Sequence, residues 1–395
     1  MIDDDRLNVE TRVIHLAEGQ ASEASPLTTP IYQTTTFVFD CAEDVRRYNE
    51  GRTHRFLYSR YENPSVVSVE RKIAALEGAE AAVAFSSGMA AVATTLLALV
   101  RAGDEILCSA AVYGGTLHLL QDVLARLDVE ARFLDLDAVG AAARQLTSRT
   151  RLFWFESPIN PTLRCVDVRA VAEACRARDV TSIIDNTFAS PMNQQPLALG
   201  IDLVMHSATK YLGGHADVTA GAVAGRAAQV ATIARTRRLV GTVLDPHPAY
   251  ALGRSLKTLP VRMARHNANG MAVAEFLARD PRVSSVFYPG LASHPDHAIA
   301  VRQMRGFGGM VCFDLDGSYE RAARFFDHLR VFCRAASLGG VESLCSLPVL
   351  TSQWGHTDDQ LARAGVTRGM VRLSVGLEDA NDLIADVDQA LAATV

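Results

Sequence analysis

Two side chains that can do chemistry stand at the ends of two short, mainly apolar segments. Asp185 ends the run 180–185, and Lys210 follows the run 201–205 after a few small polar residues. Short apolar runs that end in turn residues predict buried strands. Ligands of parallel sheets bind where the strands end. The sequence therefore predicts that a carboxylate and an amine meet at one edge of a sheet.

An amine beside a carboxylate is the pair that pyridoxal phosphate (PLP) requires. This cofactor needs a lysine for its aldehyde, a carboxylate for its ring nitrogen, donors for its phosphate and a flat partner for its ring. The carboxylate favours the protonated ring nitrogen, which makes the ring an electron sink. Taken singly, Lys210 fits a solvated charge and Asp185 fits a turn or cap residue. Together they predict a PLP site.

Candidate phosphate donors occur in two places. Gly88 and Met89 stand at a predicted helix start, where free backbone N–H groups and the helix dipole favour an anion. Ser207 and Thr209 place hydroxyl groups two residues apart just before the lysine. Glycine turns and hydroxyl residues are common, so the prediction depends on their joint order along the chain.

Strands alternate with helices from residue 81 to residue 205. This alternation predicts an α/β fold with a mostly parallel sheet and helices on both faces. Strands are expected at 81–85, 105–109, 133–136, 152–155, 180–185 and 201–205, and helices at 90–100, 116–127, 139–146 and 168–178. Further along, helices are expected at 227–239, 252–278 with a break near Pro260, 298–304, 319–329 and 380–393, and strands at 283–288, 310–315, 331–336 and 370–375.

Three parts of the chain follow from this pattern. Residues 1–60 lack periodicity and are expected to form an N-terminal arm that lies on a neighbouring subunit. Residues 61–255 are expected to form the large PLP-binding domain, and 256–395 a smaller C-terminal α/β domain. At 395 residues the chain is long enough for two domains.

Composition and net charge indicate which kinds of molecule the protein binds. The net charge of −5 gives no electrostatic footprint for nucleic acid or an anionic membrane surface. No apolar run approaches the ~20 residues that span a bilayer. Seven cysteines without a C-x-x-C pair and an acidic N-terminus indicate reduced thiols in a cytoplasmic protein. We therefore expect a small-molecule substrate.

His294 and His297 lie in a proline-containing turn with no third ligand, so no metal is expected.

Ordered motifs along the chain resemble the Cys/Met-metabolism PLP-dependent enzymes, a group that includes cystathionine γ-lyases, cystathionine γ-synthases and methionine γ-lyases. The resemblance covers the chain from about residue 10 to its end and implies a fold-type I PLP-dependent transferase fold. The motifs are Tyr58-Ser59-Arg60, Ser87-Gly88-Met89-Ala90, Tyr113-Gly114-Gly115-Thr116, Glu156-Ser157-Pro158-x-Asn160-Pro161, Asp185-Asn186-Thr187, Ser207-Ala208-Thr209-Lys210, Ser337-Leu338-Gly339-Gly340 and Arg372-Leu373-Ser374-Val375-Gly376.

The resemblance implies a role for each matching position. Lys210 resembles the lysine that binds the cofactor and shuttles protons, Asp185 the ring-nitrogen partner, and Tyr113 the tyrosine that stacks on the ring and protonates the leaving thiolate. Phosphate ligands are implied at Gly88, Met89, Ser207 and Thr209, and from a neighbouring subunit at Tyr58 and Arg60. The substrate carboxylate is implied to bind Asn160, Ser337 and Arg372. The family resemblance also implies a homotetramer built from two dimers with shared sites.

Four positions bear on the substrate. Family members that handle cystathionine generally carry acidic residues where this chain has Leu57 and Ala336, so an apolar thioether such as methionine is favoured. Methionine γ-lyases usually carry cysteine at the place of Gly115, and β-lyases often carry tryptophan at the place of Leu338. The leading hypothesis is PLP-dependent γ-elimination from methionine or a cystathionine-like amino acid. γ-Replacement, as in cystathionine γ-synthase or O-acyl-homoserine sulfhydrylase, stays open, as does a PLP-binding protein without turnover.

Overall fold

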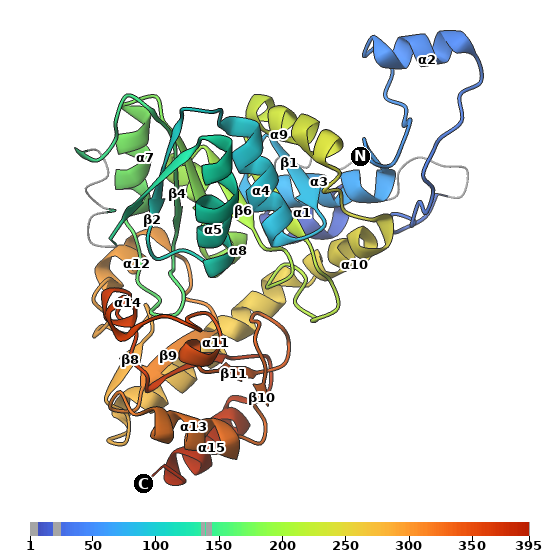
Figure 1. Cartoon of the computed structure of the whole chain (residues 1–395). Helices are drawn as coiled ribbons and strands as arrows, with labels where there is room; N and C mark the ends of the chain where they lie inside the picture. Colours follow the sequence, from blue (N-terminus) through green and yellow to red (C-terminus); the bar gives the residue numbers. More distant parts are fainter. Residues whose placement is uncertain (1–6, 19–24, 136–138, 140–143, 395) are drawn as a thin grey trace.

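The structure is a computed structural model that describes residues 7–18, 25–135, 139 and 144–394. Two sheets organise the chain (Figure 1). We call the seven-stranded sheet with its helices the large lobe, and the five-stranded sheet with its helices the small lobe. The α/β fold, with helices on both sides of a mixed, mostly parallel sheet, confirms the predicted fold class.

The sheet of the large lobe has the strand order β1-β7-β6-β5-β4-β2-β3. Strands β6, β5, β4, β2 and β3 run parallel to one another, whereas β7 pairs antiparallel with both β1 and β6. The strands span Ala81–Phe85 (β1), Glu105–Ser109 (β2), Glu130–Leu134 (β3), Thr150–Glu156 (β4), Thr181–Asp185 (β5), Leu203–His206 (β6) and Gly221–Gly225 (β7). The parallel strands bring the carboxyl ends of β4, β5 and β6 to the same edge.

Both faces of this sheet are buried by helices. Alternate residues of one strand join different cores: Ile183 packs with residues of α4 and α9, while Ile184 packs with residues of α7. The helices of this part are α3 (Pro64–Glu77), α4 (Gly88–Leu99), α5 (Gly114–His118), the π-helix η2 (Leu119–Val123), the 3₁₀ helices η3 (Leu124–Leu127) and η5 (Pro196–Leu199), α7 (Val168–Arg176), α8 (Ser190–Asn193), α9 (Ala227–Val240) and α10 (Pro246–Leu256).

Local signals set where the helices begin and end. Asn63 caps α3 through a hydrogen bond from Ser65 N, Pro64 occupies the first turn, and Gly78 ends the helix in the left-handed conformation. Ser87 caps α4 in the same way by accepting from Ala90 N. Pro260 lies in the first turn of α11 (Leu259–Arg279), so it starts a new helix after α10 rather than bending a long one.

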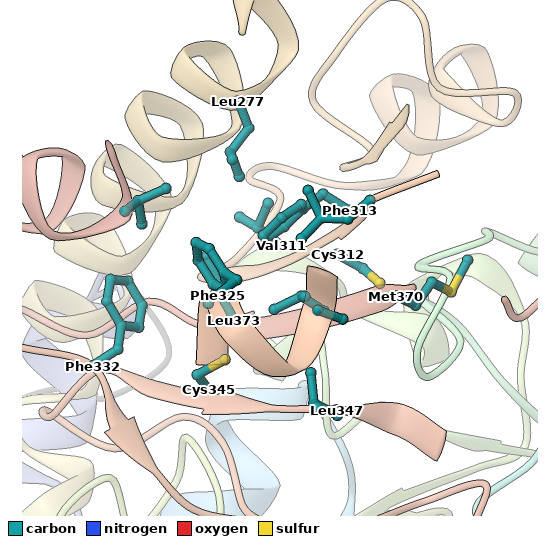
Figure 2. Close-up of a cluster of buried hydrophobic side chains, with 14 of the residues drawn as sticks. Leu277, Val311, Cys312, Phe313, Phe325, Phe332, Cys345, Leu347, Met370 and Leu373 are labelled. Carbon is teal, nitrogen blue, oxygen red and sulfur yellow. The ribbon is translucent and has the colours of Figure 1, made fainter. Parts of the chain in front are cut away.

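The small lobe is built on the sheet β10-β11-β12-β9-β8, in which only β10 and β11 run parallel. Its core joins Leu277 of α11 to Phe313 of β9 and Leu373 of β12, with Phe325 from α13 (Figure 2). The elements are β8 (Ser285–Phe287), α12 (His297–Gln303), β9 (Met310–Asp314), α13 (Tyr319–His328), β10 (Cys333–Arg334), β11 (Leu344–Ser346), η6 (Pro348–Leu350), α14 (Asp358–Arg363), β12 (Met370–Ser374) and α15 (Ala380–Ala392).

The N-terminal segment lies partly on its own chain. α1 (Val9–His15) packs on α3, Val13 is buried, and the buried Lys72 Nζ donates to Val13 O and pairs with Glu18. In contrast, α2 (Ala42–Asn49) has no buried residue and projects away from both lobes (Figure 1). The start of the expected arm is therefore anchored to this subunit. Contact of the remainder with a neighbour stays a prediction, as does the domain division at residue 255.

Several predicted elements differ from the structure. Strand β7 was missed because Gly221–Gly225 holds only glycine, alanine and one valine. The helix expected up to residue 127 is divided into α5, η2 and η3, and the strand expected at 331–336 is limited to Cys333–Arg334. Residues 140–143 of the helix expected at 139–146, and the end of the strand expected at 133–136, lie outside the described residues.

Candidate active site

A cavity of about 860 Å³ opens where the carboxyl ends of β4, β5 and β6 face the small lobe. The large lobe contributes the start of α4, the turn before α5 and the segments after these three strands. The small lobe contributes residues 336–338, the segment 350–356 and Arg372 of β12. Of the residues expected at the site, those lining the cavity are Gly88, Met89, Tyr113, Gly115, Asn160, Asp185, Ser207, Thr209, Lys210, Ala336, Ser337, Leu338 and Arg372.

Lys210 lies after β6 and points its amine across the cavity to the small lobe. Its Nζ donates to Ser337 Oγ at 3.0 Å, and no carboxylate of the described chain pairs with it. Burial lowers the pKa of Lys210, and the positive charge of Arg372 lowers it further. A lowered pKa increases the fraction of neutral amine, the form that reacts with an aldehyde.

Asp185 ends β5 on the face of the sheet that α4 covers. Its Oδ1 accepts from Thr187 N at 3.0 Å and from Thr187 Oγ1. Burial raises the pKa of Asp185 above its ordinary value, although the two Thr187 hydrogen bonds and the charge of His206 oppose this rise. These donors stabilise an ionised carboxylate in a low-dielectric position.

The start of α4 forms a cradle for an anion. A Cβ atom at Gly88 would lie 2.8 Å from Ser207 Oγ, so only glycine lets the main chain approach this hydroxyl group. The Thr209 hydroxyl donates to Ala220 O and accepts from Ala220 N, which holds the turn before Lys210 in place. Backbone N–H groups at a helix start, with hydroxyls beside them, fit a phosphate group.

Tyr113 lies at the start of α5 with 52% of its surface exposed. Its backbone N–H donates to Glu156 Oε1 at 2.6 Å, which fixes the main chain at this turn. A Cβ atom at Gly115 would lie 2.6 Å from Tyr113 Cε1. Glycine at position 115 therefore leaves room for the phenol ring, and a cysteine there would displace it.

Arg372 provides a second anion site on the small-lobe side. Only 7% of its surface is exposed, its Nη1 donates to Asn160 Oδ1 at 2.8 Å, and its Nη2 donates to Ser337 O at 3.2 Å. Ser337 holds a φ of +143°, which L residues rarely adopt. A buried guanidinium held by neutral oxygen atoms retains charge for a carboxylate.

Three expected residues lie away from this cavity. Arg60 stacks over the rings of Tyr61 at 5.0 Å and Tyr58 at 5.5 Å, and its Nη1 donates to Arg238 O at 2.7 Å. Leu57 also does not line the cavity. Within one subunit, Tyr58, Arg60 and Leu57 are therefore not brought together with Lys210.

Two groups stand out among the cavity residues that were not expected from the sequence. Glu156 ends β4 just as Asp185 ends β5, so the signal that identified Asp185 could have identified it as well. The segment 350–356 has no such signal, because it begins at the last residue of the 3₁₀ helix η6 and shows no periodicity. It lines the cavity with Leu350, Thr351, Ser352, Trp354 and His356.

The residues present fit PLP. The amine of Lys210 and the carboxylate of Asp185 face one cavity, the cradle at Gly88 accepts a phosphate, and Tyr113 offers a flat ring. Lys210, Asp185, Ser207 and the start of α4 would hold the cofactor. Arg372 is held by Asn160 and Ser337 rather than by an acid, so its charge would remain available for an anion.

The electrostatic effect of Arg372 on Lys210 can be measured. Replacing Arg372 by glutamine removes one of the two causes that lower the lysine pKa, so this pKa should rise. The midpoint pH for the reaction of apoenzyme with PLP, followed by absorbance, should therefore move upward. Arg368→Gln is the matched control, because Arg368 is exposed and pairs with Asp358. An unchanged or lower midpoint in Arg372→Gln would contradict this account.

The chain is similar to known proteins along almost its whole length. The chain is 43% identical to L-methionine gamma-lyase of Pseudomonas putida over 386 residues, which cover 97% of each protein. It is 45% identical to cystathionine gamma-synthase of Mycobacterium bovis, with 96% of each covered. The crystal structure of metB from Corynebacterium glutamicum superposes with a TM-score of 0.92 at 38% identity, covering 99% of each chain. Residues 10–392 match the family described as "Cys/Met metabolism PLP-dependent enzyme", and the chain belongs to this family.

Proposed function

We propose that this PLP-dependent enzyme cleaves the carbon–sulfur bond of L-methionine or a related sulfur amino acid by γ-elimination. The observation that carries the proposal is the lining of the cavity. Its only carboxylates among the described residues are Glu156 and Asp185, at the strand ends. The small-lobe side has no carboxylate among its described residues: it presents Ala336, Leu338, Leu350 and Trp354 beside Ser337, Thr351, Ser352, His356 and Arg372. A distal ammonium group would find no counter-charge there, whereas an apolar thioether fits.

Different side chains of this subunit would bind the substrate and transfer protons. Arg372, with Asn160 and Ser337, would bind the substrate carboxylate and orient the amino acid. The bound cofactor supplies an electron sink for the carbanion at Cα. The amine of Lys210, once free, would take the proton from Cα. The Tyr113 phenol would protonate the departing sulfur, and general acids of this kind contribute ~10²- to 10⁴-fold.

The direct test is incubation of the purified holoenzyme with L-methionine. We expect methanethiol, ammonia and 2-oxobutyrate in equal amounts, because each methionine reacts with one water molecule overall and gives one molecule of each product. Methanethiol is measured with a thiol reagent and 2-oxobutyrate as a hydrazone. Absence of the keto acid with both methionine and cystathionine would exclude the lyase proposal.

The absence of a carboxylate from the described residues on the small-lobe side of the cavity leads to a second prediction, about substrate specificity. Ala336→Glu places a carboxylate on the cavity lining, where it can meet the distal ammonium of cystathionine. The ratio of kcat/KM for cystathionine to that for methionine should rise about tenfold. Ala335→Glu is the matched control, because Ala335 is exposed and does not line the cavity. Equal ratios for the two variants would show that this side of the cavity does not select the side chain.

γ-Replacement is the second candidate, and one observation favours it. Ser352 Oγ and His356 Nδ1 are buried at the cavity and have no hydrogen-bond partner within the described residues. Two hydrogen-bonding groups without partners suit the ester of an O-acyl-homoserine better than a thioether. Formation of a thioether from O-acetylhomoserine and a thiol, without keto acid, would identify this activity.

We also propose that the site is completed by a second copy of this chain in a homotetramer built from dimers, and that the enzyme is cytoplasmic. Tyr58 and Arg60 lie outside the cavity of their own subunit, beside the end of α9, where Leu239 and Val240 expose apolar surface. Such a surface fits contact with another subunit. The seven cysteines are free thiols, which supports a reducing compartment. No helix in the described part of the chain combines the length and apolarity of a membrane span.

Mixing two inactive variants tests whether sites are shared. Arg60→Ala should lose phosphate affinity and Lys210→Ala should lose the covalent link to PLP. If each site combines residues of two subunits, subunit exchange restores one intact site in each mixed dimer. Half of the dimers are mixed, so activity should return to roughly a quarter of the wild-type value. No recovery, with exchange verified by differently tagged subunits, would contradict shared sites.

A further inference from the structure

A second carboxyl group lies beside Asp185 in the cavity. Glu156 ends β4 and is the register partner of Asp185 on the neighbouring parallel strand. Register partners point to the same face of a sheet with their Cβ atoms about 5 Å apart. Glu156 is only 6% exposed, and no cation of the described chain forms an ion pair with it. Two carboxyl groups in this arrangement do not both ionise easily.

The hydrogen-bond donors decide which of the two groups holds a proton. Asp185 accepts two hydrogen bonds from Thr187, and the charge of His206 also favours its ionised form. Among the described residues, Glu156 accepts one hydrogen bond, from the backbone N–H of Tyr113. Burial and the charge of Asp185 both raise the pKa of Glu156, well above its ordinary value. The proton therefore belongs on Glu156.

We propose that Glu156 is a positioning residue, held as a neutral carboxylic acid, that fixes the Tyr113 main chain and leaves Asp185 as the ionised carboxylate of the site. The carbonyl oxygen of a neutral acid still accepts the Tyr113 N–H. The acid adds no negative charge next to Asp185, so the full charge of Asp185 is available to the cofactor. The proposal rests on PLP binding and holds for elimination and replacement alike.

Other ionisable groups around Glu156 define what a titration can report. Asp185 on β5 and Cys108 on β2 face it directly, and burial keeps the Cys108 thiol neutral by raising its pKa. Lys210, Arg372 and the Tyr113 phenol line the same cavity. His206 lies on the opposite face of the sheet, paired with the buried Glu77. The test must therefore compare variants that differ at position 156 alone.

The first measurement is the infrared C=O stretch of protonated carboxyl groups in the apoenzyme at pH 7. A band present in the wild type should be missing in Glu156→Gln. In Asp185→Asn the charge that opposes ionisation is removed, so the band should disappear at a lower pH than in the wild type. A wild-type spectrum without a band assignable to Glu156 would overturn the proposal.

Stability against pH gives a second measurement on the apoenzyme. In the unfolded chain Glu156 ionises near its ordinary pKa, and in the folded chain its pKa is raised. Folding above the ordinary value therefore takes up a proton, and wild-type stability must fall as pH rises toward the raised pKa. Glutamine has no proton to gain. The Tm of the wild type, relative to Glu156→Gln, should thus decrease from pH 5 upward, and parallel Tm curves would contradict a neutral acid.

PLP affinity separates positioning from a merely structural role. Glu156→Gln keeps an oxygen acceptor for Tyr113 N–H, so its affinity at pH 7 should stay close to the wild-type value. Glu156→Ala leaves this N–H unpaired, and its Kd for PLP should rise about tenfold. Glu105→Gln is the matched control, since Glu105 is buried in the same sheet but pairs with Arg132. It should lower Tm without changing PLP affinity. Equal affinity losses in the Gln and Ala variants at position 156 would refute the proposal.

Discussion

The site depends on bringing buried charges together at one sheet edge without letting them neutralise one another. Asp185 is held by Thr187, and Lys210 is held by Ser337, so the carboxylate and the amine each have a neutral partner. An ion pair between them would consume the two groups that a cofactor needs. The parallel strands β5 and β6 make this separation possible, because they end at the same edge of the sheet. Asp185 and Lys210 are then held by separate turns, one after each strand.

Hydrogen bonds across the cavity join the large lobe to the small lobe. Lys210 comes from the large lobe and bonds to Ser337 of the small lobe, while Arg372 of β12 reaches back to Asn160 after β4. Neither sheet alone contains a cavity with both anion sites. The hydrophobic cores hold the sheets, and these polar contacts set the distance between them across the cavity. A change in the packing of β12 would therefore move Arg372 as well as the small-lobe core.

Much of the fold and the site follows from local sequence signals. Apolar runs ending in Asp185 and Met205 predict strands of a parallel sheet, and the strand ends predict which side chains meet. The expected roles of Arg372 and Asn160 needed the family resemblance, since residues separated by more than two hundred positions have no shared local pattern. Strand β7 was missed because its small side chains allow close packing but leave no period of apolar residues. Trp354 was missed for a related reason, since an irregular segment places its side chains by tertiary contacts alone.

The unbalanced charge of the cavity explains why it suits an anionic ligand. Arg372 and Lys210 are both engaged by neutral oxygen atoms of Asn160 and Ser337, and Asp185 is the one ionised acid if Glu156 keeps its proton. Burial penalises this excess of positive charge, as the lowered pKa values of Lys210 and Arg372 show. A phosphate at the start of α4 and a carboxylate at Arg372 would each relieve that penalty. Part of the affinity for anionic ligands is thus stored in the folded protein as uncompensated positive charge.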